Sequence, residues 1–295
     1  AQVGDIMNSK FIRLVKSRPL LIMCSIVILI FIIMAVFADF IAPYSPTATD
    51  FSNPMSAPSA EHIFGTDRLS RDIFSRMIHG LRMSLFIGLI PPSINLVLGA
   101  LLGMLAGLSN KWIDMIIMRL VDIALSYPFM ILAMAIIYNL GPGMMTMMFA
   151  LVVLGWASSA RIIRAQTKMI ANETYVDAAK SMGLSRFSVM KAHILPNIRS
   201  TLIVIYTMEI PESILAEAGL SFLGFGAQAP MTSLGVMVSD GRSYVFDAPW
   251  MSIAPGIFIL LLSLSFNFLG DELRDYFGLK GGSKPVSYTH LRAHE

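Results

Sequence analysis

The sequence predicts an all-α, polytopic membrane protein with six transmembrane helices. Of its 295 residues, 55% are hydrophobic and 14% are charged, whereas a soluble domain has about 45–50% apolar and about 25% charged residues. The mean hydropathy is +0.68. Apolar runs of about 20 residues recur along the chain, and a helix needs this length to cross a bilayer. The formal net charge of +3 is small, and we expect contact with a lipid membrane and no nucleic acid.

The first predicted transmembrane helix covers residues 20–42, and residues 1–19 form a cytoplasmic N-terminal segment. The apolar run is too long for the core of a signal peptide and has no clear cleavage site, so we expect it to be retained. Four cations directly precede the run, and the positive-inside rule therefore places the N-terminus in the cytoplasm. These cations are Lys10, Arg13, Lys16 and Arg18.

Residues 43–82 are predicted to form an extracytoplasmic loop that contains an amphipathic helix. Prolines early in the loop break any helix there. The apolar residues at positions 73–78 fall on one helical stripe, which predicts a short amphipathic helix. Arginines and acidic residues nearly balance in the loop, and we expect Asp67 and Asp72 to pair with nearby arginines.

Residues 83–270 are predicted to form the transmembrane core, with helices two to six. In the second helix, Gly99, Gly103 and Gly107 repeat at four-residue spacing. Small residues at this spacing allow another helix to approach closely. The partner helix could belong to this chain or to another subunit.

The third apolar run, residues 113–140, contains both charges and a proline. Arg119 and Asp122 are one turn apart and are expected to form an ion pair, because a charge in lipid is costly without a partner. Pro128 should kink the helix.

The polar segment 161–197 is predicted to lie in the cytoplasm. Between positions 161 and 199, seven cations stand against two anions, which favours the inner side of the membrane. Residues 271–295 form the predicted cytoplasmic tail. Its last part, from residue 283, has no apolar period and is predicted to be disordered or non-native.

Within this segment the pattern predicts two short helices around a glycine bend. The first covers residues 173–182 with Asn172 as its cap, and Gly183 stands where a left-handed stop belongs. Ser185 can cap the second helix, and Pro196 is expected to end it.

This stretch resembles the EAA loop in the membrane subunits of ATP-binding-cassette (ABC) importers. The family pattern is Glu-Ala-Ala, three residues, Gly, nine residues, then Ile-x-Leu-Pro. An Asp replaces the Glu and a His stands at the Ile position, and the peptide-transport branch commonly has His-Ile-Leu-Pro-Asn there. The matching positions, which the resemblance implies contact an ATPase, are Asp177, Ala178, Ala179, Gly183, His193, Leu195 and Pro196.

Three further stretches are similar to the same family. Residues 62–85 resemble its F-G-T-D-x-x-G-R-D signature, with Ser70 where the family usually has Gly. Residues 214–230 resemble I-L-x-E-A-x-L-S-F-L-G-x-G-x-Q-x-P, and residues 267–275 resemble N-x-x-G-D-x-L-R-D. The resemblance covers roughly residues 10–280 and identifies the chain as similar to the C-type permease subunit of dipeptide, oligopeptide or nickel importers.

The resemblance implies a type I ABC importer permease in the bacterial cytoplasmic (inner) membrane, with both termini in the cytoplasm. Such a chain forms half of a pore with a related B-type permease. Two cytoplasmic ATPases and an extracytoplasmic solute-binding protein complete the system, and the segment from Asp177 to Pro196 would be its coupling helix. Residues 198–250 would line the path or face the binding protein. The cargo could be a dipeptide, a longer peptide, nickel or a related solute.

The chain itself is not expected to be an enzyme. It has no G-x-x-x-x-G-K-[ST] phosphate loop and no spacing typical of metal ligands. We expect no bound cofactor, with ATP and Mg on the partner ATPases. Its one cysteine, Cys24, rules out an internal disulfide.

Three carboxylates in the fifth apolar run, residues 198–222, leave an alternative open. Glu209, Glu212 and Glu217 could line a watery translocation path, or they could bind a proton or cation in an ion-gradient-driven secondary transporter. The second class should show two repeated halves, and no such repeat is found. A purely structural assembly protein would leave the segment at Asp177 unexplained.

Overall fold

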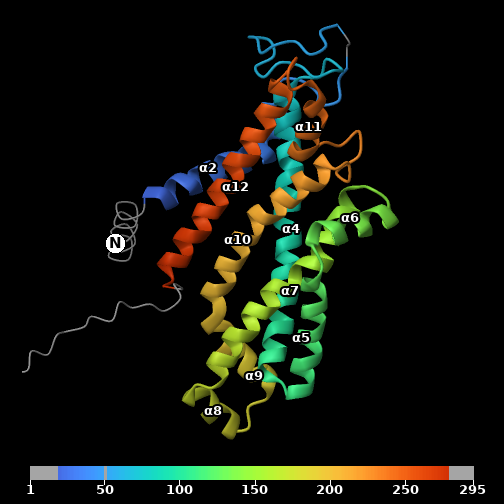
Figure 1. The fold of residues 1–295 in the computed structure, drawn as a ribbon. Helices are drawn as coiled ribbons and strands as arrows, with labels where there is room; N and C mark the ends of the chain where they lie inside the picture. The colour runs from blue at the N-terminus through green and yellow to red at the C-terminus, as the bar shows by residue number, and fades with distance from the viewer. Residues whose placement is uncertain (1–18, 50–51, 279–295) are drawn as a thin grey trace, which may run out of the picture.

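The computed structural model describes residues 19–49 and 52–278, and this part of the chain contains helices and no β-strand. The helices form an elongated bundle in which α4 runs along most of the length (Figure 1). In chain order they are α2 (Pro19–Val36), α3 (Ala38–Ile41), α4 (Ile73–Leu108), α5 (Lys111–Ser126), α6 (Phe129–Leu140), α7 (Met144–Ala171), α8 (Thr174–Ser181), α9 (Arg186–Val189), a π-helical turn (Met190–Ile194), α10 (Leu195–Phe222), α11 (Leu234–Gly241), a 3-10 turn (Arg242–Tyr244) and α12 (Trp250–Tyr276).

Four of the described helices are long and apolar enough to cross a membrane, namely α2, α4, α7 and α12. A fifth span is possible if the bent pair α5 and α6 counts as one. The expected number of six is reached only when α10 is added. Its 28 residues would extend about 42 Å, enough to cross a bilayer, but its three carboxylates make it more polar than the other spans.

The loop helix and the second transmembrane helix, which were predicted as separate elements, form one continuous helix. α4 begins directly after Asp72, whose Oδ2 accepts a hydrogen bond from the Ser75 N–H at 2.7 Å. Gly80 is the only helix breaker between the amphipathic stripe and the apolar run, and α4 continues through it and through Pro91 and Pro92 to Leu108. The prediction of a short separate helix was therefore wrong. The first span is in turn shorter than predicted, because α2 ends at Val36.

The third predicted span is broken where only a kink was expected. α5 ends at Ser126, Pro128 precedes α6, and the two helix axes differ by 88°. Proline pushes the residue before it into extended conformation, and Tyr127 has ψ 147°. The chain therefore turns sharply, and α6 points away from the long axis of the bundle (Figure 1).

Several charges in the described part have partners other than those predicted. Asp122 does not pair with Arg119, because its Oδ1 accepts a 2.6 Å hydrogen bond from Arg161 on α7. The carboxylate of Asp114 on α5 likewise binds two cations of α7, Arg164 and Lys168. The sequence pattern alone gave no sign that α5 lies against α7, so only neighbours along the helix were considered.

Of the two carboxylates in the predicted outer loop that were expected to pair with arginines, one does so. Asp67 binds Arg71 at 2.7 Å and also contacts Arg76. Asp72, in contrast, pairs with the His62 ring at 2.9 Å. Ser70 has φ 59°, a left-handed conformation that favours glycine. A glycine, which the family pattern usually has at this position, would adopt this conformation without the strain that Ser70 bears.

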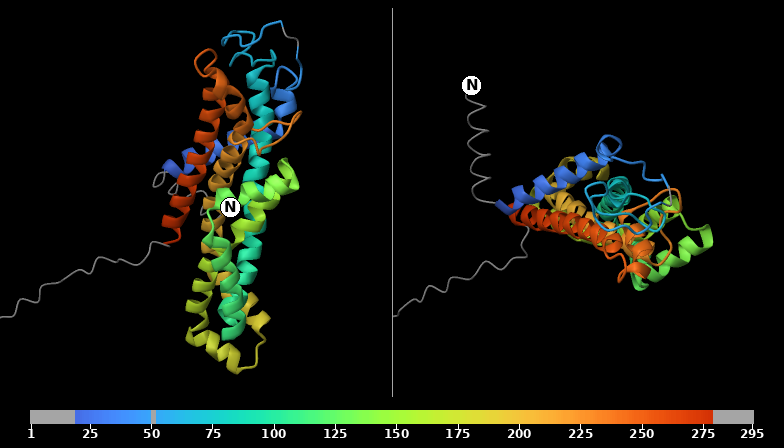
Figure 2. Two further views of the ribbon diagram at one scale, coloured as in Figure 1. Left: turned by 45° about the vertical axis from the view of Figure 1, so that its right-hand side comes forward. Right: turned by 90° about the horizontal axis from the view of Figure 1, so that it is seen from above.

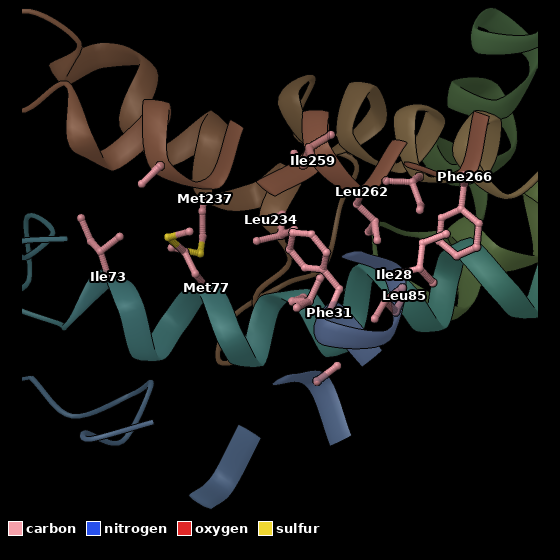
Figure 3. Packing of buried hydrophobic residues seen from close by; sticks show 14 of the residues in the cluster. Ile28, Phe31, Ile73, Met77, Leu85, Leu234, Met237, Ile259, Leu262 and Phe266 are labelled. Carbon is pink, nitrogen blue, oxygen red and sulfur yellow. The ribbon is translucent and has the colours of Figure 1, made fainter. Parts of the chain in front are cut away.

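The half of the bundle next to this loop is held by an apolar core between α2, α4, α10, α11 and α12. Figure 3 shows Phe31 of α2 pointing toward residues of the other helices, with Met77 of α4 against Met237 of α11. α2 lies across α12 and α4 at one side of the bundle (Figure 2). The N-terminal helix is thus anchored to the rest of the fold.

The predicted glycine stripe of α4 packs against α7 of the same chain. A Cβ at Gly103 would lie 2.7 Å from the carbonyl oxygen of Ala160, and one at Gly99 would lie 2.7 Å from Cβ of Ser159. Of the two possibilities left open, packing within the chain is the one observed.

Replacing Gly103 with Ala should lower the thermal stability of the protein. The new methyl group would meet backbone atoms of α7, and overpacking of this kind costs about 1–3 kcal/mol. The matched control is Gly256→Ala in α12, where a Cβ would have no neighbour within 4 Å. There the better helix propensity of Ala should leave stability equal or higher. Equal melting temperatures for the two variants in detergent would contradict the close packing.

Candidate functional site

α8 and α9 lie at the end of the bundle far from the predicted outer loop, and we call it the inner end after its predicted cytoplasmic side (Figure 1). Gly183 has φ +82°, and the N–H groups of Gly183 and Leu184 donate to the carbonyls of Lys180 and Ala179. These two bonds are the pattern of a Schellman motif, in which glycine closes the helix. The predicted glycine stop is therefore present, and it sets the direction of the chain after α8.

The helix start before this bend and the helix end after it differ from the prediction. Asn172 ends α7, and Glu173 is the residue that precedes α8. Ser185 caps α9 as expected, since its Oγ accepts from the Ser188 N–H at 3.2 Å. Pro196 does not end a helix, because it lies in the first turn of α10. The π-helical turn joins α9 directly to α10.

The two small residues of α8 face opposite environments. Ala179 is 2% exposed and faces the body of the chain together with Val176. Ala178 and Asp177 are exposed. Both alanines were predicted to meet a partner, but Ala179 is already covered by its own chain, which leaves Ala178 as the small residue available for a contact.

The inner end exposes large apolar side chains on α8, at its C-cap and on α9. Met182 is 74% exposed, Phe187 is 67% exposed and Tyr175 is 46% exposed. Exposed apolar groups gathered beside a polar rim are typical of a protein interaction surface. Together with Ala178 and Asp177, these three residues form what we call the inner surface.

The remaining predicted positions hold the inner surface in place. His193 lies against the Tyr175 ring, with 5.9 Å between ring centroids, and its carbonyl accepts a hydrogen bond from Asn197. Lys180 donates to the Ala171 carbonyl at 2.8 Å and to Asp177 at 3.0 Å. Leu195 is partly exposed at the start of α10.

A cavity of about 650 Å³ lies further along α10, between that helix and α4, α6 and α7. Glu209 and Glu212 both line it. One oxygen of Glu209 accepts a hydrogen bond from Ser159 of α7. Asn95 of α4 lines the same cavity, and sequence reasoning missed it because a single Asn in an apolar run gives no pattern.

Glu217 is separated from the other two carboxylates. It is 0% exposed, and its oxygens accept hydrogen bonds from Ser84, Ser221 and Ser233 at 3.2, 2.7 and 2.5 Å. These hydroxyls belong to α4, α10 and the residue that caps α11. Glu217 therefore joins three helices and does not line the cavity.

Comparisons with known proteins identify the family of the chain. Residues 99–275 match the family model of the binding-protein-dependent transport system inner membrane component. Residues 9–58 match the N-terminal transmembrane domain of oligopeptide transport permease C.

Curated relatives match over most of their length. The dipeptide transport system permease protein of Alkalihalophilus pseudofirmus is 40% identical, over 88% of this chain and 86% of the relative. The probable D,D-dipeptide transport system permease protein of Escherichia coli is 38% identical, over 94% and 93%. The oligopeptide transport system permease protein of Bacillus subtilis is 36% identical, over 88% and 85%.

A solved structure supports the fold. A chain of an inward-facing methionine ABC transporter superposes with a TM-score of 0.56 at 18% identity, covering 69% of this chain and 97% of that chain. None of the comparisons supports an ion-gradient-driven secondary transporter. The matched family, the relatives and the helical fold agree, and the protein belongs to the inner-membrane permease subunits of binding-protein-dependent ABC importers.

Proposed function

We propose that this permease translocates peptides, or a solute closely related to peptides, and that ATP hydrolysis on other chains drives it. The observation that carries the proposal is the inner surface. It has the small side chain of Ala178 among exposed apolar side chains, and the glycine bend at Gly183 ends the helix that presents them. The names of the relatives, which are dipeptide, oligopeptide and glutathione permeases, support the peptide class.

The inner surface is the proposed docking site for one cytoplasmic ATPase. Aromatic and methionine side chains are the residues that interfaces favour, and a small residue at the centre lets a partner approach. The excess of cations in segment 161–199 supports its cytoplasmic side, and with it a cytoplasmic location of both termini. ATP and Mg would bind to the ATPases, and this chain would carry no cofactor or catalytic group.

The other proposed partners are needed because one chain would supply only part of a pore. A B-type permease would cover the cavity side of α10 and complete the path. A solute-binding protein would deliver the cargo at the outer loop and at α11. Closure of the ATPases would push the inner surface, and the continuous connection through the π-helical turn would pass that movement to α10.

Reconstituted vesicles test this function. The complete complex with its binding protein should take up a dipeptide when ATP is supplied on the ATPase side, and vanadate should stop uptake. Collapse of ion gradients by an ionophore should leave uptake unchanged. Uptake that follows an ion gradient and ignores vanadate would contradict the proposal.

A further inference from the structure

The cavity beside α10 has the size and the lining of a ligand site. Its volume of about 650 Å³ falls within the range of about 300–1,000 Å³ that is usual for small-molecule pockets. Most of its wall is apolar and comes from side chains such as Phe129, Met130 and Leu151. A few polar groups interrupt this wall, and their chemistry indicates what the cavity accepts.

The polar groups present hydrogen-bond acceptors without partners. Asn95 is 6% exposed, and its Nδ2 donates to the Leu151 carbonyl at 3.3 Å, while its Oδ1 is buried without a hydrogen bond. Glu209 binds Ser159 through Oε1, and its Oε2 is likewise buried without a partner. Buried polar atoms in native proteins are normally satisfied, so these two unpaired acceptors, on residues that line one cavity, call for a donor.

The charges around the cavity have one sign. Glu209 and Glu212 both line it, and no Lys, Arg or His is among its described lining residues. Glu209 is partly buried and Glu212 is exposed, and withdrawing a carboxylate oxygen such as Glu209 Oε2 from water is costly without a cationic partner. The occupant should therefore bring a positive charge together with several N–H donors.

A glycine on α7 makes the position of Asn95 possible. A Cβ at Gly155 would lie 2.0 Å from Asn95 Nδ2, so any other residue would displace the amide. The amide nitrogen of Asn95 thus occupies space that Gly155 leaves free, and this contact fixes the orientation of the whole amide group.

We propose that this cavity binds a primary ammonium group of the transported solute, with Glu209 Oε2 and Asn95 Oδ1 as acceptors. An ammonium group has three donors and one positive charge, which matches two open acceptors and the nearby Glu212. The apolar wall then receives the rest of the solute. The proposal rests on the proposed peptide function, because the α-amino group of a peptide is such an ammonium group.

A cysteine in the cavity wall tests the charge preference. Ser158 lines the cavity on α7, and Ser158→Cys is made in a chain whose Cys24 is replaced by Ser, within the complex of both permeases and both ATPases. A cationic aminoethyl thiosulfonate should react about tenfold faster than an anionic sulfonatoethyl one, since a cleft with charges of one sign concentrates the opposite ion. Glu209→Gln should reduce that ratio, and Glu61→Gln in the outer loop should not.

Protection by peptide tests the ammonium group itself. Millimolar alanyl-alanine should slow the labelling, N-acetyl-alanyl-alanine should not, and Asn95→Ala or Glu209→Gln should weaken the protection. Equal protection by both peptides would overturn the proposal. A cysteine that stays unreactive in every nucleotide state would also overturn it, because the cavity would then not be accessible to a solute. The labelling needs no ATP, so the two proposals can fail separately. If the complex shows ATP-driven uptake but the peptide gives no protection, only this inference is contradicted. If the peptide protects but ATP drives no uptake, only the proposed function is contradicted.

Discussion

Replacing Ala178 with Trp should lower ATP-driven uptake by about thirtyfold or more, because a loss of about 2 kcal/mol is typical when the centre of an interface is disturbed. Ala178 is exposed on α8, between the apolar side chains of the inner surface. An indole ring at this position would hold the ATPase away from the permease. Its own fold should not suffer, because the side chain points away from the body of the chain.

Ala178→Ser is the matched control at the same position, and it should transport normally because the side chain remains small. Complex assembly and the melting temperature of both variants check that the fold is intact. A cysteine at Ala178, in the Cys24→Ser chain, should form a crosslink with a cysteine in the ATPase surface. If the Trp variant transports at the normal rate in an assembled complex, the inner surface does not couple the two proteins.

Replacing Glu217 with Ala should cost about 3 kcal/mol of stability, since three buried hydroxyl groups lose their acceptor and each can cost about 1–3 kcal/mol. Some of these hydroxyls can turn to backbone carbonyls, so the total loss of stability stays below the sum of the three individual costs. The contact between α4, α10 and the start of α11 should loosen, so the melting temperature and the yield of folded protein should both fall.

Glu212→Ala is the control, because Glu212 is an exposed carboxylate on the same helix. Its loss should leave the melting temperature nearly unchanged. Glu217→Ser should restore little of the melting temperature that is lost in Glu217→Ala. Size-exclusion profiles after heating in detergent would measure both variants. A drop of the same size for Glu212→Ala and Glu217→Ala would argue against a special role of the hydroxyl cluster.

The features that the sequence predicted well are those that depend on local physics. The left-handed conformation of Gly183, the Ser185 cap and the close approach at Gly103 follow from residue type and spacing alone. The overall helical class followed from composition. Such features need no knowledge of which helix lies beside which.

The features that were missed depend on contacts between distant segments. The three serine partners of Glu217 could not be foreseen, because periodicity cannot tell whether a carboxylate faces a cavity or neighbouring hydroxyl groups. The burial of Ala179 depends on how α8 folds back onto the chain. Pro196 was expected to end a helix, yet a proline in the first turn is equally compatible with beginning one.

The way in which Glu217 is fixed gives α10 the properties of a lever. The hydroxyl cluster holds the outer part of the helix, and the inner surface is attached to its other end. At about 1.5 Å per residue, Leu195 is about 33 Å from this pivot and Glu209 is about 12 Å from it. A tilt about Glu217 would therefore move the cavity wall by roughly a third of the displacement at the inner end. A large displacement of the inner end at the proposed ATPase contact would become a small displacement of the cavity wall, with a correspondingly greater force.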